Sequence, residues 1–213
     1  MRQSAISFKS KGLSLEGVVA FPDGDAGPLP GVVLCHPHPL RGGNMDNNVV
    51  LSVAYALVEA GIAILRFNFR GVGNSEGEHT EGKMESQDAL NALKVFKGWP
   101  GVVGNRVGVA GYSFGSRVVL ETAELHKKAR ALALISPPLQ AVEATPLRND
   151  KRQVLIIAGD QDRLVQSEGL EPALDGFATR PELHLIAGAD HFWGGFEDQM
   201  TPKVCRFFAE HLK

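Results

Sequence analysis

The sequence predicts an α/β fold built on a mostly parallel, doubly wound sheet, with an antiparallel pair of strands at the N-terminus. The main observation is that short apolar runs alternate with amphipathic helical segments through most of the chain. Such runs are typical of parallel strands, which are buried on both faces beneath layers of helices. The length of 213 residues suits one domain with a full core, so we expect a single domain over residues 1–213.

The strands are predicted from apolar runs bounded by turn residues. Residues 6–8 and 15–21 form the antiparallel pair, and the Pro- and Gly-rich residues 22–31 form the loop after it. The remaining strands are predicted over residues 32–35, 63–69, 106–110, 131–135, 154–158 and 183–186. Ligands of parallel sheets bind at the carboxyl ends of the strands, so we expect the chemistry in the loops that follow them.

The helices are predicted from apolar residues spaced three or four positions apart. Gly61 ends the first helix, and Thr201-Pro202 opens the last one, because proline is tolerated at the first helical position. The predicted helices cover residues 49–60, 85–97, 113–125, about 168–177, and 201 onward. Their inward residues include Val50, Val53, Ala54, Leu57, Val58, Ala89, Ala92, Leu93, Phe96, Val204, Phe207, Phe208 and Leu212.

The composition excludes several classes of partner and compartment. A net charge of −2 gives no electrostatic reason to expect nucleic acid or an anionic membrane as a partner. No apolar run approaches the roughly 20 residues that a membrane span requires. The first twelve residues contain no apolar leader, so we expect a cytoplasmic protein. Cys35 and Cys205 are far apart in apolar runs, which is typical of two buried free thiols.

One abrupt strand-to-helix junction carries a serine between two glycines. The segment GYSFG, residues 111–115, joins the predicted strand 106–110 directly to a helix. Gly111 and Gly115 remove side chains that would collide in so sharp a turn. Ser113 is then held in a strained conformation, with its hydroxyl above the sheet and beside a helix N-terminus. In this context the pattern predicts a nucleophilic serine on an elbow.

A serine nucleophile needs a base, and that base needs an acid to orient it. The sequence supplies an acid and then a histidine after successive apolar strands, in GDQDRLV and GADHF. We assign His191 as the general base and Asp162 as the acid. Asp160 and Asp190 are the competing carboxylates, of which the first could brace its loop and the second its own turn. No chemical role is assigned to four other histidines: His79, His126, His184 and His211.

The oxyanion of the tetrahedral intermediate needs two backbone N–H donors. One is predicted from Phe114, directly after the serine. The other is predicted from the loop HPHPL, where Pro37 and Pro39 have no N–H and His38 lies between them. Leu40 is the alternative donor. A metal bound by His36 and His38 lacks a third ligand at convincing spacing, so we expect no metal, and a structural role for His36.

These motifs together resemble the α/β-hydrolase superfamily over nearly the whole chain. FNFRGVGNS, residues 67–75, resembles its D-x-R-G-x-G-x-S loop, with Asn68 where aspartate is usual. HPHP followed by GGNMDN is similar to small bacterial hydrolases grouped near the dienelactone hydrolases, whose nucleophile is a cysteine where this chain has Ser113. Lids of the superfamily usually follow the strand matching residues 131–135. Only residues 136–153 lie there, too few for a cap domain.

The resemblance implies a serine carboxylesterase that hydrolyses small, short-acyl esters through an acyl-enzyme, without a cofactor. A thioester, lactone or peptide is an alternative substrate of the same triad, and a non-catalytic binding protein is the alternative outside catalysis. Pro137, Pro138 and Leu139 are candidates to line the acyl pocket, and Arg70 to shape its wall. Exposed apolar surface could support a homodimer through the final helix. The natural substrate does not follow from the sequence.

Overall fold

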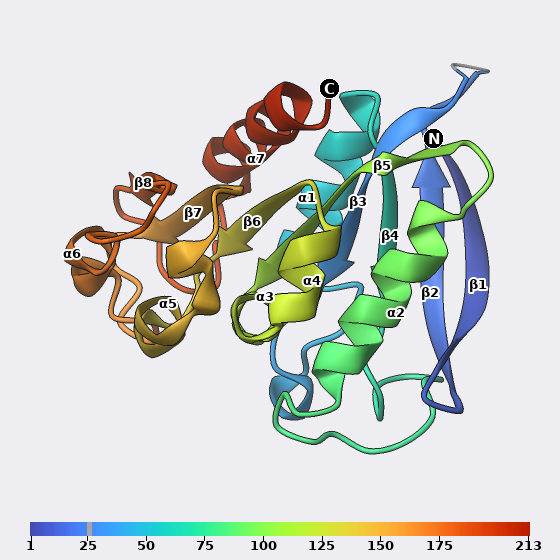
Figure 1. Cartoon of the computed structure of the whole chain (residues 1–213), viewed down its shortest axis with the longest axis horizontal. Helices are drawn as coiled ribbons and strands as arrows, with labels where there is room; N and C mark the ends of the chain where they lie inside the picture. Colours follow the sequence, from blue (N-terminus) through green and yellow to red (C-terminus); the bar gives the residue numbers. More distant parts are fainter. Residues whose placement is uncertain (25–26) are drawn as a thin grey trace.

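A computed structural model describes residues 1–24 and 27–213, and shows eight strands joined in one twisted sheet (Figure 1). Their order across the sheet is β1-β2-β4-β3-β5-β6-β7-β8. The first two neighbouring pairs are antiparallel and all the others are parallel. The strands are β1 (Arg2–Ser10), β2 (Leu13–Phe21), β3 (Leu29–Cys35), β4 (Ala63–Phe67), β5 (Val102–Tyr112), β6 (Ala131–Ile135), β7 (Gln153–Gly159) and β8 (Glu182–Ile186).

Helices cover both faces of the sheet and enclose two apolar cores (Figure 1). Helices α1 and α7 pack together on one face, and the other helices lie on the opposite face. The α-helices are α1 (Asn48–Glu59), α2 (Glu85–Lys97), α3 (Phe114–Glu121), α4 (Ala123–Lys128), α5 (Leu139–Ala144), α6 (Leu170–Ala173) and α7 (Glu197–His211). Short 3-10 helices cover Pro39–Arg41, Pro146–Asn149 and Ser167–Gly169. No helix within the described residues is long and apolar enough to cross a membrane.

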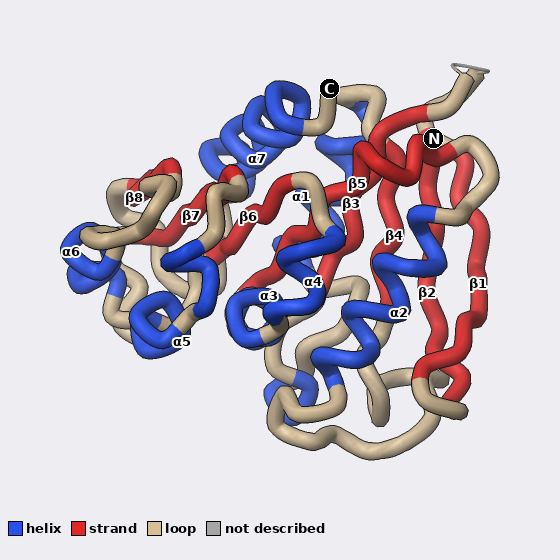
Figure 2. The backbone as a smooth tube through the Cα atoms, viewed as in Figure 1, coloured by secondary structure: helices blue, strands red, loops and turns tan. Residues whose placement is uncertain are grey.

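The strand order places the chemistry between β3 and β5. From β3 the chain moves outward to β4 on one side, and β5 then returns to the other side of β3. A crevice opens where the order reverses in this way, beyond the carboxyl ends of the two strands. The loops after β3 and β4 lie together at that end of the sheet (Figure 2). The HPHP loop and the serine elbow therefore meet at this crevice.

The predicted sheet is confirmed, including the antiparallel N-terminal pair, and so are the inward faces of the helices. The strands β1 and β5 are longer than predicted, whereas β6 has the predicted bounds. Every inward residue named from the helical spacing is buried in one of the two cores. Between β6 and β7 the chain forms only α5 and one 3-10 helix, so the sheet has no cap domain. The spacing of apolar residues was sufficient for these predictions because it reflects burial directly.

The single helix predicted over residues 113–125 is wrong, because it breaks at Thr122. This residue has φ −99° and ψ 82°, outside the helical region, and it separates α3 from α4. Its hydroxyl donates to the carbonyl of Val118, a local bond that competes with helix continuation. The apolar spacing runs through the break, so the pattern alone did not reveal it.

The helix predicted over about residues 168–177 is also shorter than expected. Only Leu170–Ala173 is α-helical, after the 3-10 turn Ser167–Gly169. Gly176, three residues beyond the end of α6, has a positive φ of 83°, which lies outside the helical region. The backbone at Gly169 also lies so close to α5 that an added Cβ would be 2.4 Å from Leu139. A residue larger than glycine would therefore not fit at this contact without displacing Leu139.

The last helix begins one turn earlier than predicted, at Glu197 instead of Thr201. Glu197 accepts hydrogen bonds from the Gly195 amide and the Asn48 side chain, which stabilises the start of α7. Pro202 consequently lies inside the helix, where it cannot donate to the carbonyl of Asp198. Since Pro202 faces solvent, water can reach this turn of the backbone.

Arg70 does not shape the pocket wall, contrary to the prediction. Its guanidinium is buried and bonds Asp88 of α2 through Nε at 2.9 Å and Nη2 at 2.6 Å. Asp88 is fully buried and also accepts from the Ser10 hydroxyl at 2.6 Å. This bidentate pair joins the loop after β4 to α2 and the first hairpin.

Replacing Asp88 with Asn should strongly destabilise the fold. The change leaves the buried Arg70 guanidinium without its counter-charge, which costs about 3–5 kcal/mol. Urea denaturation followed by circular dichroism measures the loss, with the exposed Glu210→Gln variant on α7 as a control that stays within about 0.5 kcal/mol of wild type. A loss below about 1 kcal/mol for Asp88→Asn would show that the ion pair contributes little.

Candidate active site

Ser113 lies on a strained elbow between β5 and α3. Its backbone has φ 53° and ψ −112°, and its amide donates to the Ile135 carbonyl at 2.9 Å. An added Cβ on Gly111 would lie 2.5 Å from the backbone of Gly115. A Cβ on Gly115 would lie 2.2 Å from the carbonyl oxygen of Cys35. The first glycine thus lets the elbow close as predicted, and the second lets it pack against the end of β3.

The structure brings Ser113, His191 and Asp162 together in one hydrogen-bonded chain. The hydroxyl Oγ of Ser113 lies 2.9 Å from Nε2 of His191. The other ring nitrogen, Nδ1, lies 2.8 Å and 3.1 Å from the two carboxylate oxygens of Asp162. The Asp162 side chain is fully buried, so its carboxylate is shielded from water on the side facing the ring. Ser113, His191 and Asp162 therefore have the mutual geometry that a nucleophile, a base and an orienting acid need for acyl transfer.

The two competing aspartates have structural contacts instead. Asp160 accepts a hydrogen bond from the Gly188 amide at 2.8 Å, which joins the loops after β7 and β8. Asp190 accepts from the Phe192 amide at 2.9 Å within its own turn. Neither carboxylate bonds the ring of His191 in the part of the chain that the structure describes. Only Asp162 has the position of an orienting acid.

Two aromatic residues that sequence reasoning missed hold the His191 loop. The Tyr112 hydroxyl donates to the His191 carbonyl at 2.6 Å, and burial raises the pKa of this phenol, so it remains a donor. Trp193 is fully buried, and its indole N–H donates to the Ser136 hydroxyl at 3.1 Å. Both residues flank predicted catalytic residues in the sequence, but nothing in their spacing indicates these long-range contacts.

The two amides predicted to bind the oxyanion have no competing acceptor among the described residues. The Phe114 amide is at the N-terminus of α3, and the His38 amide lies in the loop after β3. The alternative donor, the Leu40 amide, already bonds Nδ1 of His38 at 3.2 Å.

The predicted structural role of His36 agrees with its contacts. Its buried ring accepts from the Phe69 amide at 3.1 Å and contacts the Pro37 carbonyl at 2.7 Å.

A cavity of about 560 Å³ opens beside Ser113 and His191. Pro138, Leu164 and Phe192 give it apolar walls, and the last two are largely exposed. Of the three residues predicted to line an acyl pocket, Pro138 does so, whereas Pro137 and Leu139 do not border the cavity. Two guanidinium groups, Arg41 and Arg117, also line it.

Both cysteines are free thiols, as predicted. Cys35 is buried as predicted, but Cys205 is only half-buried.

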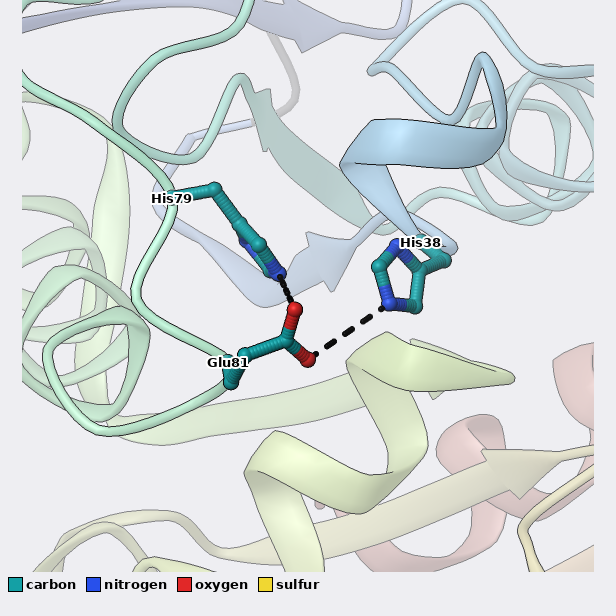
Figure 3. A group of neighbouring side chains, drawn as sticks. All are labelled: His38, His79 and Glu81. Carbon is teal, nitrogen blue, oxygen red and sulfur yellow. Dashed lines mark ion pairs between the residues drawn. The ribbon is translucent and has the colours of Figure 1, made fainter.

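A cluster of two histidines and a glutamate lies next to the oxyanion loop (Figure 3). It contains His38, His79 and Glu81, whose side chains point toward one another from two separate loops. No chemical role was predicted for His79 from the sequence, where it lies in a different loop from His38. Only the folded loops bring the two rings to a centroid distance of 5.0 Å.

An uncapped, mostly parallel sheet with a serine on its strand-to-helix elbow defines the class of α/β serine hydrolases. The chain belongs to the alpha/beta hydrolase domain family, which it matches over residues 31–199. It is 31% identical to an uncharacterized protein of Rickettsia prowazekii over 173 residues, covering 77% of this chain and 72% of that one.

Two further comparisons describe the relatives of this fold. A solved α/β serine hydrolase without a lid from Xanthomonas campestris superimposes with a TM-score of 0.85 at 27% identity, covering 98% and 94% of the two chains. A polyketide transferase from a Penicillium species is 28% identical over 165 residues. That match covers 76% of this chain and 52% of the transferase, so the fungal protein is considerably longer.

The buried His36 should make stability depend on pH. Burial lowers its pKa from the ordinary 6.5 to about 4. Between these values the unfolded chain binds a proton that the folded chain does not, so stability falls as the pH drops from 6.5 to 4. The expected loss from this residue is about 3 kcal/mol.

Urea denaturation of wild type and His36→Gln at a series of pH values measures this contribution. The variant should be the less stable protein at pH 7, and its stability should decline less steeply toward pH 4. Taking the difference between the two curves cancels the contribution of the other titrating groups. Parallel curves would mean that His36 is not held neutral in the folded protein.

Proposed function

We propose that this protein is a serine carboxylesterase that hydrolyses small, short-acyl esters through an acyl-enzyme. The observation that carries the proposal is the 2.9 Å contact between Ser113 Oγ and His191 Nε2 at the edge of an open cavity. The alpha/beta hydrolase family supports hydrolysis as the general chemistry. The absence of a cap over the sheet supports small, soluble substrates.

The proposed reaction has two halves that use the same residues. As Ser113 Oγ attacks the ester carbonyl, its proton passes to Nε2 of His191, and the carbonyl oxygen becomes an oxyanion. The amides of Phe114 and His38 stabilise that oxyanion. Collapse of the intermediate breaks the bond to the alcohol oxygen, which takes the proton from His191. A water then attacks the acyl-serine by the same steps, releasing the acid and restoring the Ser113 hydroxyl.

Asp162 acts on this cycle through the histidine. Its carboxylate accepts from Nδ1–H, so the lone pair of the neutral ring is on Nε2, facing Ser113. It also stabilises the imidazolium that forms in the transition state. The amides of Leu164 and Val165 donate to the same carboxylate at 3.2 Å and 3.3 Å. These bonds keep the carboxylate aimed at the ring.

The cavity supports a short acyl chain. Its apolar walls come from a few side chains on the loops after β6, β7 and β8, including Pro138, Leu164 and Phe192. A helical lid, which would cover a long chain, does not follow β6. An extended acyl group would therefore gain little apolar burial beyond its first carbons.

A thioester is the second candidate acyl donor. The similarity to a polyketide transferase favours it, since a serine triad transfers acyl groups from sulfur or oxygen by the same steps. Lactones and peptides use the same chemistry. A non-catalytic binding protein is disfavoured because the serine, histidine and aspartate keep hydrogen-bond distances of 2.8–2.9 Å.

Hydrolysis of p-nitrophenyl esters from acetate to decanoate tests the proposal. We expect activity to be highest for the shortest chains and to decline with chain length. Ser113→Ala should lower kcat by on the order of 10⁶-fold, to background, while the exposed control Ser7→Ala keeps wild-type rates. Ester hydrolysis that survives Ser113→Ala would disprove the mechanism. Labelling by a fluorophosphonate without cleavage of any ester would redirect the search to thioesters, lactones and peptides.

The acid is tested by a matched pair of aspartate variants. Asp162→Asn should lower kcat by roughly 10³–10⁴-fold, because the amide favours the wrong tautomer of His191. Asp190→Asn, one residue from the histidine in sequence, should retain activity within a few-fold, since its carboxylate contacts only the Phe192 amide. Steady-state kinetics on p-nitrophenyl acetate measures kcat for both variants. Equal losses in both variants would contradict the assignment.

A further inference from the structure

We propose that His38, His79 and Glu81 form a binding site for one Zn²⁺ ion at the edge of the active site. The site uses the three side chains drawn in Figure 3, which come from the loop after β3 and the loop between β4 and α2. It departs from the sequence-based expectation of no metal. That expectation considered His36 with His38, whereas the fold directs the ring of His36 to the Phe69 amide.

The donor atoms have the spacing of a zinc site before any ion is added. Nε2 of His79 lies 3.3 Å from Oε1 of Glu81, and Nε2 of His38 lies 3.8 Å from Oε2. All three donor atoms lie within 4.8 Å of one another. Tetrahedral zinc with bonds of about 2.0–2.2 Å places neighbouring ligand atoms roughly 3.3–3.6 Å apart. A rotation of the exposed Glu81 side chain would bring its carboxylate closer to both rings.

His79 is the strongest evidence for a ligand. Its side chain is only 6% exposed, and neither ring nitrogen has a hydrogen bond of acceptable geometry among the described residues. Buried polar atoms without a partner are uncommon, because each costs about 1–3 kcal/mol. A metal on Nε2 would supply the missing partner on the side that faces Glu81 and His38.

A buried carboxylate lies behind His79, as in many metal sites. Oε1 of Glu85 lies 2.9 Å from Nδ1 of His79, on the side away from the proposed ion. Glu85 is fully buried and fixed by hydrogen bonds from Thr80 and Gly82. Metal-binding histidines usually direct their second nitrogen to such a carboxylate, which orients the ring and strengthens the metal bond.

The donor set selects the class of metal. Two imidazoles and one carboxylate suit Zn²⁺, whereas Ca²⁺ and Mg²⁺ prefer oxygen donors only. Glu81 is 60% exposed, so solvent reaches the cluster and a water can occupy the fourth position. Zinc bound by three protein ligands and a water is therefore the expected state.

Zinc at this site would also change the oxyanion loop. In the metal-free ring, Nδ1 of His38 accepts from the Leu40 amide, so Nε2 carries the ring proton. A metal on Nε2 displaces that proton to Nδ1, which then cannot accept from Leu40. The turn that carries the His38 amide must adjust. We therefore expect zinc to slow ester hydrolysis, a consequence that rests on the proposed function.

Zinc binding is tested on tag-free, chelator-treated protein by equilibrium dialysis. One Zn²⁺ per chain should bind, and His79→Phe should weaken it by more than about 100-fold. Phenylalanine keeps an aromatic ring against Phe114, so the variant retains the packing of this loop. Its zinc-free ester hydrolysis should stay within twofold of wild type. Co²⁺ titration should produce the visible absorption bands of a tetrahedral site in wild type but not in His79→Phe.

His184→Asn is the matched control for adventitious zinc. His184 is partly buried and lies 2.6 Å from Glu182, and this histidine–glutamate pair has no third metal-ligating side chain among the described residues. Its loss should leave zinc binding unchanged. Equal binding by wild type and His79→Phe, or loss of binding only in His184→Asn, would overturn the proposed site. If ester hydrolysis is unchanged with one zinc bound, the coupling to the oxyanion loop is wrong. If the protein cleaves no ester, zinc binding by itself still tests the metal site.

Discussion

The close approach of the serine elbow to the end of β3 is the constraint on which the site depends. The backbone at Gly115 lies so near the Cys35 and His36 carbonyls that no side chain fits between them. This contact sets the distance between the loop after β5 and the loop after β3. It therefore determines whether the Phe114 and His38 amides can face one oxyanion beside Ser113.

The other two proposed catalytic residues, Asp162 and His191, are positioned by loops with buried contacts. Asp162 is held by amides of its turn and bonds His191. Two hydrogen bonds hold the loop of His191. One runs from the Tyr112 hydroxyl to the His191 carbonyl, and the other from the Trp193 indole to Ser136, directly after β6. Three neighbouring strands thus support one histidine, which explains how an uncapped and solvent-open site can keep the 2.9 Å contact to Ser113.

The loop that carries His38 would contribute to both proposed sites. Its backbone amide belongs to the proposed oxyanion hole, and its side chain faces His79 and Glu81 on the other side. A ligand of the side chain acts on the backbone through the Leu40 amide, because both share the same short turn. The loop between β4 and α2 would thus bind a metal that affects the oxyanion loop, without contributing any group to the proposed reaction. Its other end is fixed independently by the buried Arg70–Asp88 pair.

Sequence alone was enough to predict the sheet, the helix faces and the three residues Ser113, Asp162 and His191 that form one hydrogen-bonded chain. Apolar periodicity reports burial, and the order of serine, aspartate and histidine follows the order of the strands. Tertiary structure decided the rest. The earlier start of α7, the buried position of Arg70 and the contact between His38 and His79 all depend on long-range contacts. Such contacts leave no local pattern, because each joins segments that are distant along the chain.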